Sequence, residues 1–101
     1  MPKLNVTIPH QLGADEARRR IQGAVAEAMG RYGDKVSNLQ ERWEGDRGEF
    51  SGKAMGFNLS GTVTVRPDAV EIRGDLPLAA AMFKGQIEAA IRERGSKLLA
   101  E

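Results

Sequence analysis

The sequence contains no cysteine, and His10 is its one histidine. Without thiols the chain has no disulfides, no thiolate chemistry and no cysteine ligands for a metal. A single histidine also lacks the second imidazole of a usual zinc site, and we expect neither a metal nor another cofactor. A serine triad would have to be built on His10, and no serine lies in a nucleophile-elbow context. We therefore expect a protein that is not an enzyme.

Long hydrophobic runs are missing as well, since no apolar stretch approaches the roughly 18 residues of a membrane span. The 15 basic and 14 acidic residues nearly cancel, so no global field attracts the chain to nucleic acid or anionic lipid. Met1-Pro2-Lys3 leads directly into strand-like sequence rather than into the apolar region of a signal peptide. At 101 residues, we expect one domain, residues 1–101, in the cytoplasm.

What the sequence does contain is a strict alternation of apolar and polar residues between Phe57 and Leu76. A period of two predicts two strands of a half-buried antiparallel sheet, and Arg66-Pro67-Asp68-Ala69 has the composition of the turn between them. The register that follows pairs inward residues with inward residues: Val65 with Val70, Val63 with Ile72, Gly61 with Gly74, and Leu59 with Leu76. The glycine pair leaves a bare patch on the buried face, suited to a sharp bend or to a closely packed helix.

The remaining elements follow from the same periodicities. Alternation predicts a first strand over 3–8, and apolar residues at three- and four-residue spacing predict a helix over 14–32, ended by a left-handed Gly33. A strand over 36–44 and a four-residue loop over 45–48 would set Trp43 opposite Phe50, followed by a looser turn over 52–56. Pro77 would open a last helix over 78–99, in which Gly85 allows close contact with the sheet and the turn after Gly95 frays.

This order of elements predicts an α+β fold. If the first strand lies beside the last, the result is a five-stranded, curved, antiparallel sheet with both helices on one face. The β-α-β-β-β-β-α order then makes a reduced helix-grip arrangement, in which the sheet holds the C-terminal helix.

Three further features are candidates for binding. Glu41 falls on the inward side of its strand, opposite Gly52 in the expected register, where a carboxylate could line a cavity unless the strand edge twists it outward. Met55, in a turn, and Met82, at the flank of an apolar stripe, are candidates for exposed apolar contacts. Arg18-Arg19-Arg20 makes the first helix locally basic, which is typical of a solvated face or of a phosphate contact.

Four segments carry a resemblance to a known family. They are Pro9-His10-Gln11-Leu12-Gly13 before Glu16-Ala17-Arg18, Trp43-Glu44-Gly45-Asp46 with Phe50, Gly61-Thr62-Val63-Thr64-Val65, and Phe83-Lys84-Gly85-Gln86-Ile87-Glu88. The chain resembles the polyhydroxyalkanoic acid system proteins, which are encoded near genes for storage-polyester metabolism. The matching motifs are structural, and none is catalytic. The resemblance implies a bacterial cytoplasmic protein associated with polyester granules or their metabolism, with undefined molecular activity.

The sequence leaves three functions open. The first is a non-enzymatic accessory protein that contacts a granule surface or granule protein through Met55 and Met82, or through the cleft between the sheet and the last helix. The second is a carrier of an apolar, acyl-type molecule, with Glu41 and the Gly61–Gly74 pair lining its pocket. The third is a nucleic-acid-binding protein that uses the basic first helix.

Overall fold

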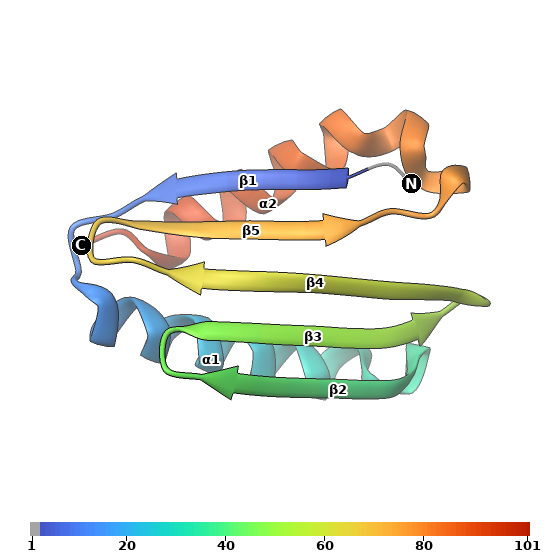
Figure 1. Ribbon diagram of the computed structural model, residues 1–101, viewed down its shortest axis with the longest axis horizontal. Helices are drawn as coiled ribbons and strands as arrows, with labels where there is room; N and C mark the ends of the chain where they lie inside the picture. Colours follow the sequence, from blue (N-terminus) through green and yellow to red (C-terminus); the bar gives the residue numbers. More distant parts are fainter. Residues whose placement is uncertain (1–2) are drawn as a thin grey trace.

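The computed structural model describes residues 3–101 (Figure 1); Met1 and Pro2, on which the expected absence of a leader depends, lie outside the described residues. The elements follow the expected order. The strands are β1 (Lys3–Pro9), β2 (Val36–Glu44), β3 (Arg47–Ala54), β4 (Phe57–Val65) and β5 (Ala69–Asp75). The helices are α1 (Ala14–Tyr32) and α2 (Lys84–Leu98), with short 3-10 segments η1 (Gly33–Lys35) and η2 (Leu78–Phe83) before β2 and α2.

The five strands form one antiparallel sheet in the order β1-β5-β4-β3-β2. The first strand therefore lies beside the last, and the α+β prediction is confirmed. Both helices lie behind the same face of the sheet, α2 against β1 and α1 behind β2 and β3 (Figure 1). The opposite face, which we call the outer face, carries no helix (Figure 1). The helix-grip likeness stays a prediction.

The β4–β5 register is confirmed at three of its four expected pairs. These are Val65 with Val70, Val63 with Ile72, and Gly61 with Gly74. The fourth pair, Leu59 with Leu76, does not form. Pairing ends at Ser60 and Asp75, where β5 itself ends two residues before a proline. Proline has no N–H to donate to a sheet, so the strand stops short of it.

The buried core lies at one end of the sheet, which we call the packed end (left in Figure 1). There the end of β1, the start of α1 and the end of α2 meet the β4–β5 turn. Its buried residues are Val6, Ile8, Ala17, Ile21, Val65, Val70 and Leu99. Burying each of the larger aliphatic side chains contributes about 1.5–3 kcal/mol, so this end holds most of the fold's hydrophobic stabilisation.

At the other end of the sheet, which we call the open end, the same face is only partly covered (right in Figure 1). The two helices are closest at the packed end and diverge from there. Within residues 3–101, the exposed large apolar side chains all belong to the open end: Met29, Tyr32, Met55, Phe57, Leu59, Leu78, Met82 and Phe83. Phe57 and Leu59 lie on the same face of β4 as the buried Val65, as their alternation predicts. Both nevertheless remain more than a third exposed.

The expected β2–β3 register was wrong. The connecting turn is two residues long, with Gly45 at a left-handed φ of 57°, and Trp43 pairs with Gly48 rather than with Phe50. The indole ring of Trp43 lies over Gly48 and occupies the space that a side chain there would need, since a Cβ on Gly48 would lie 2.7 Å from the ring. Trp43 still meets Phe50 diagonally, edge to face at 5.9 Å, so the expected aromatic contact forms in a different register.

Two predicted turns also differ. Gly33 has a right-handed φ of −60°, and the chain continues from α1 into η1 instead of ending in a left-handed cap. The looser turn expected over 52–56 is a tight two-residue turn, Met55-Gly56, because β3 extends to Ala54.

The last helix departs from prediction in three places. Residues 78–83 form the 3-10 segment η2 instead of α-helix. A Cβ on Gly85 would have no atom within 4 Å, so this residue makes no close contact with the sheet, whereas a Cβ on Gly95 would lie 2.1 Å from Cδ1 of Ile8. Gly95 is thus the residue that lets α2 approach β1. The turn after it does not fray, since Leu99 is buried in the core.

Candidate functional site

The open end presents Met55 at the tip of the β3–β4 hairpin. Its side chain is 91% exposed and its φ is 54°, a left-handed value that costs a methionine roughly 1 kcal/mol. Two-residue hairpin turns of this kind normally carry asparagine or aspartate followed by glycine, and only Gly56 follows that preference here. An apolar side chain thus occupies an exposed position where a polar residue would fold better.

The segment η2 adds apolar side chains from a different part of the chain. Leu78 and Met82 are 79% and 82% exposed, and Phe83 is about half exposed. Figure 1 places η2 at the same end of the molecule as the β3–β4 turn and the last turn of α1. Three separate elements therefore place exposed apolar side chains at the same end of the molecule.

Three lysines lie at the same end of the molecule. Lys35 ends η1, Lys53 is the next-to-last residue of β3 and Lys84 is the first residue of α2; all three are exposed, and none forms an ion pair with the side chains of residues 3–101. Two open ends facing one another would bring these like charges together, which opposes self-association through this surface.

The other sequence candidates lie apart from the open end. Glu41 is exposed on the edge strand β2, where its Oε2 accepts a hydrogen bond of 2.7 Å from Nε1 of Trp43. An inward charge on an edge strand discourages pairing with another sheet. Gly61 and Gly74 are paired, and a Cβ on either would lie about 3 Å from a carbonyl oxygen of the neighbouring strand. The absence of side chains at these two positions therefore allows two strands, rather than a strand and a helix, to approach closely.

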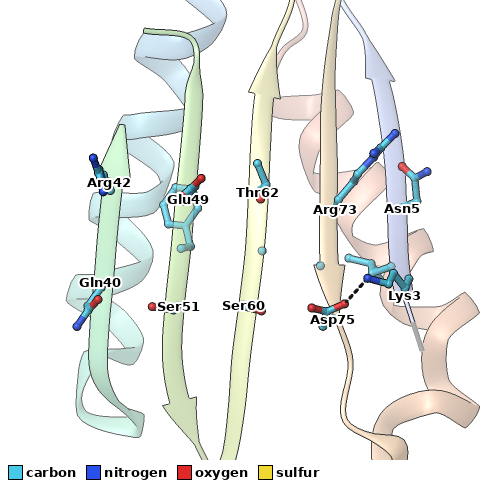
Figure 2. Close-up of a pocket in the computed structure, with 14 residues that line it drawn as sticks. Lys3, Asn5, Gln40, Arg42, Glu49, Ser51, Ser60, Thr62, Arg73 and Asp75 are labelled. Atoms are coloured by element: carbon cyan, nitrogen blue, oxygen red, sulfur yellow. Dashed lines mark ion pairs between the residues drawn. The ribbon is translucent and has the colours of Figure 1, made fainter. Parts of the chain in front are cut away.

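The outer face holds a depression of about 660 Å³ across the middle of the sheet. The backbones of Gly61 and Gly74 line it, but Glu41 does not. Figure 2 shows short hydroxyl side chains on the middle strands together with the longer Glu49 of β3, and longer polar side chains on the strands to either side. Most residues that line this depression are polar or charged, and it lies on the face away from the helices, unlike the cleft between the sheet and the last helix that the carrier hypothesis names.

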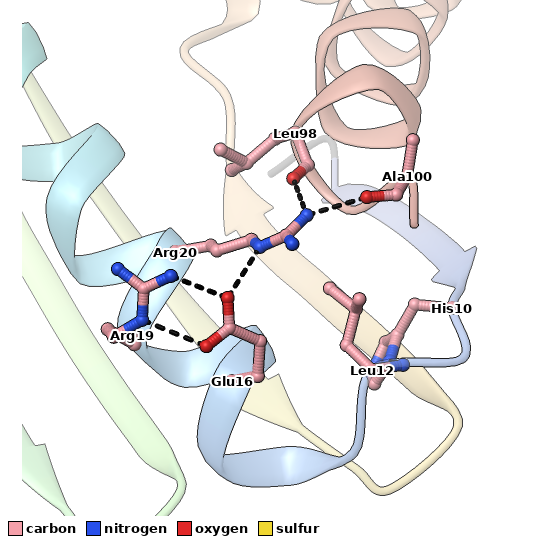
Figure 3. Close-up of polar contacts among 7 residues, drawn as sticks. All are labelled: His10, Leu12, Glu16, Arg19, Arg20, Leu98 and Ala100. Atoms are coloured by element: carbon pink, nitrogen blue, oxygen red, sulfur yellow. Dashed lines mark hydrogen bonds and ion pairs between the residues drawn. The ribbon is translucent and has the colours of Figure 1, made fainter.

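The three consecutive arginines of α1 are engaged within the protein. Arg18 pairs with Asp46 of the β2–β3 turn, and Arg19 pairs with Glu16. Arg20 pairs with Glu16 and also donates hydrogen bonds to the carbonyl oxygens of Leu98, at 3.0 Å, and Ala100, at 2.6 Å (Figure 3). These contacts join the start of α1 to the end of α2, so the basic run serves the packed end.

The same cluster changes the acidity of Glu16. Hydrogen bonds from Arg19 and then from Arg20 stabilise the carboxylate and lower the pKa of Glu16 from 4.5 to about 2. The pKa of Arg19 is correspondingly raised by its hydrogen bond to Glu16.

His10 is buried at the packed end, and its ring joins two loops. Nε2 lies 3.0 Å from the carbonyl oxygen of Arg66, and Nδ1 accepts a hydrogen bond of 3.2 Å from the backbone N–H of Leu12. Both contacts are satisfied in the tautomer in which Nε2 carries the proton and donates it to the carbonyl oxygen of Arg66. The side chain therefore joins the loop after β1 to the β4–β5 turn.

Two further findings bear on function. Over residues 3–101, no three histidine, aspartate or glutamate side chains lie close enough together to hold a metal ion. None of the helices in this range is both long and apolar enough to span a membrane.

Sequence reasoning missed several residues of the two surfaces. It assigned Phe57, Leu59 and Phe83 to the core. Alternation and helical spacing predict the direction in which a side chain points, but not whether another element buries it. The outer-face depression was also missed, although its signal is present in the sequence: short polar residues at outward positions of β4, with long ones at outward positions of β2 and β5.

Fold and surface together define a small α+β protein with one apolar end and one bare polar sheet face. The family model described as "Putative polyhydroxyalkanoic acid system protein" matches residues 4–99. The chain belongs to this family. No curated protein and no solved structure matches it.

Proposed function

We propose that the protein is a non-enzymatic accessory protein of the polyhydroxyalkanoate system that binds the polyester granule surface through the open end. Family membership supports a role in the polyhydroxyalkanoate system, and the exposed apolar side chains of the open end support its use as the binding surface. In this proposal the protein is cytoplasmic and associates with granules. The observation that carries the proposal is Met55, which holds an exposed apolar side chain at a strained position of a hairpin tip.

The physical basis is burial of apolar area. A fully buried methionine side chain contributes about 1.5–3 kcal/mol relative to an exposed one, so Met55 and Met82 would each add this much to binding at an apolar surface, with the other exposed apolar side chains of the open end adding to it. Because this contribution does not depend on charge, binding should persist at high salt. Backbone strain recurs at functional positions in proteins. At position 55, a residue better suited to the left-handed turn would remove the apolar contact that we propose with the granule.

Two alternatives find no support in the described structure. The carrier hypothesis requires a cleft between the sheet and the last helix, lined by Glu41 and the glycine pair, but the depression that the glycines line is on the outer face and Glu41 is not among its lining residues. The nucleic-acid hypothesis requires free arginines on α1, and Arg18, Arg19 and Arg20 all pair with groups of the same chain.

The test is co-sedimentation of the purified protein with polyester granules. Met55→Asn is the sharpest variant, because asparagine suits the left-handed turn and should raise the free energy of unfolding by about 0.5–1 kcal/mol. We expect Met55→Asn and Met82→Glu each to weaken binding about tenfold or more.

Gln11→Glu is the matched control, since it adds the same charge at an exposed position of the packed end. It should bind granules as the unmodified chain does. Unchanged binding by Met82→Glu, or equal losses for Met82→Glu and Gln11→Glu, would overturn the proposal.

A further inference from the structure

Each exposed apolar segment of the open end carries a lysine within three residues of an exposed apolar side chain. The pairs are Met55 with Lys53, Met82 with Lys84, and Tyr32 with Lys35. The three lysines are exposed, and within residues 3–101 their ammonium groups form no ion pair. Apolar contact area and free positive charge therefore occur together at this end of the molecule.

The small net charge of the whole chain conceals an uneven distribution. The three segments, residues 29–35, 53–57 and 78–84, contain four basic residues and one acidic residue, a net charge of +3, whereas the whole chain carries +1. Arg31 pairs with Glu27, and counting that carboxylate leaves an excess of two positive charges. The rest of the chain is slightly acidic, so the positive potential is concentrated at the open end.

The chain also exposes more surface than its mass requires. It exposes 6778 Å², about a fifth more than the roughly 5,600 Å² expected of a folded monomer of 11.0 kDa. The difference is similar in size to the roughly 800 Å² that one partner buries in a standard interface. Because the exposed large apolar side chains belong to the open end, this is the part that we expect a partner to cover.

Charge and shape at the open end discriminate between partners. A second copy would bring like charges together, and an acidic peptide would need a groove to lie in. Met55, Leu78 and Met82 instead protrude, with 91%, 79% and 82% of their surface exposed. Protruding apolar side chains beside lysines match the boundary of a lipid layer, where apolar chains lie beneath anionic headgroups.

We propose that the open end binds a layer of anionic phospholipid. Met55 and Met82 insert among the apolar chains, while Lys35, Lys53 and Lys84 contact the headgroup phosphates. This binding uses the same surface as granule binding but a different partner, because it needs anionic groups as well as an apolar layer. The protein would then associate with lipid-bounded surfaces in addition to polyester.

The test is flotation of the full chain with vesicles of phosphatidylcholine alone and of an equimolar mixture with phosphatidylglycerol. We expect binding to the anionic vesicles to be at least about tenfold tighter than to the neutral ones, and to weaken as the salt concentration rises. Met55→Asn should weaken binding to the anionic vesicles about tenfold, since it removes an apolar contact. Unchanged binding by Met55→Asn would indicate adsorption by charge alone and would overturn the proposal.

Lys53→Gln and Lys97→Gln form a matched pair. Lys97 is also exposed, but it lies near the end of α2 and pairs with Glu93. Lys53→Gln should weaken binding to the anionic vesicles about fivefold, and Lys97→Gln should leave it within about twofold. Equal effects of the two substitutions would contradict the role of the open-end lysines.

Bare polyester particles separate this proposal from the proposed function. A triple variant, with Lys35→Gln, Lys53→Gln and Lys84→Gln, should bind polyester as the unmodified chain does, yet bind anionic vesicles no more tightly than neutral ones. Binding of the unmodified chain to polyester but not to anionic vesicles would overturn the lipid proposal and leave the proposed function standing. Binding to anionic vesicles but not to polyester would support the lipid proposal and overturn direct contact with the granule polymer.

Discussion

The packed end and the open end use similar apolar residues on the same face of one sheet, yet only the packed end buries them. At the packed end α1 and α2 converge, joined by Arg20 and the carbonyl groups of Leu98 and Ala100. At the open end they diverge, and side chains such as Phe57 and Leu59 stay partly uncovered. The difference shows that helix placement, rather than strand pattern, decides which inward residues become core.

The largest expected effect contrasts one aliphatic residue from each end. Ile8→Ala removes a side chain that is 1% exposed and should lower the free energy of unfolding by about 2–5 kcal/mol. Leu78→Ala removes one that is 79% exposed and should change it by less than about 0.5 kcal/mol. Urea denaturation measures both, and similar losses would contradict the division into two ends.

The next effect compares the same substitution in two helices. Gly95→Ala introduces a Cβ against the fully buried Ile8 and should destabilise by about 1–2 kcal/mol, despite the gain in helix propensity. Gly23→Ala, in α1 with nothing within 4 Å, should stabilise by up to about 1 kcal/mol.

A double variant identifies the cause of the Gly95 effect. Ile8→Val removes the Cδ1 atom that the new Cβ would meet, so Gly95→Ala should be less destabilising in an Ile8→Val background than alone. Additive losses would mean that the steric contact is not responsible.

A smaller effect concerns the arginines of α1. Arg20→Ala removes two hydrogen bonds to the end of α2 and should lower stability by about 1–2 kcal/mol, with faster amide exchange at Leu99. Arg19→Ala removes one exposed ion pair and should leave stability almost unchanged. Equal exchange at Leu99 in both variants would be inconsistent with Arg20 joining the helices.

The smallest effect is a pH dependence. Because the pKa of Glu16 is lowered in the folded state, its contribution is complete above pH 4.5 and is lost as the pH falls through about 2. The difference in urea midpoint between the unmodified chain and Glu16→Gln should therefore shrink over this interval. A difference that stays constant from pH 5 to pH 2 would contradict the role of the two arginines.

Much of the sheet could be predicted because its information is local. In β4 and β5 the alternation and the Pro67 turn select one register, and a slip of one residue would expose Val63 and Val65. The β2–β3 register could not be selected in this way. Trp43 opposite Phe50 and Trp43 over Gly48 both satisfy the aromatic ring, and only the three-dimensional twist decides between them.

Helix contacts and surfaces were harder to predict. Gly85 and Gly95 look equally suited to close packing in the sequence, and the path of α2 over β1 selects Gly95. The exposure of Met55 and Met82 followed from their positions in a turn and at a stripe's flank. The rest of the open end depends on the divergence of the helices, which no local pattern encodes. The outer-face depression has a signal in the individual strands, but its lining comes from all five, so it could be located only once their order and register were known.

Hydrogen exchange of the full chain, with and without polyester particles, tests the central claim most directly. The account predicts slower exchange around Met55 and η2 when particles are present, with exchange at the packed end around Ile8 and Val70 unchanged. Protection that appears around Ile8 and Val70 but not at the open end, or no change anywhere under conditions where the protein co-sediments, would contradict it.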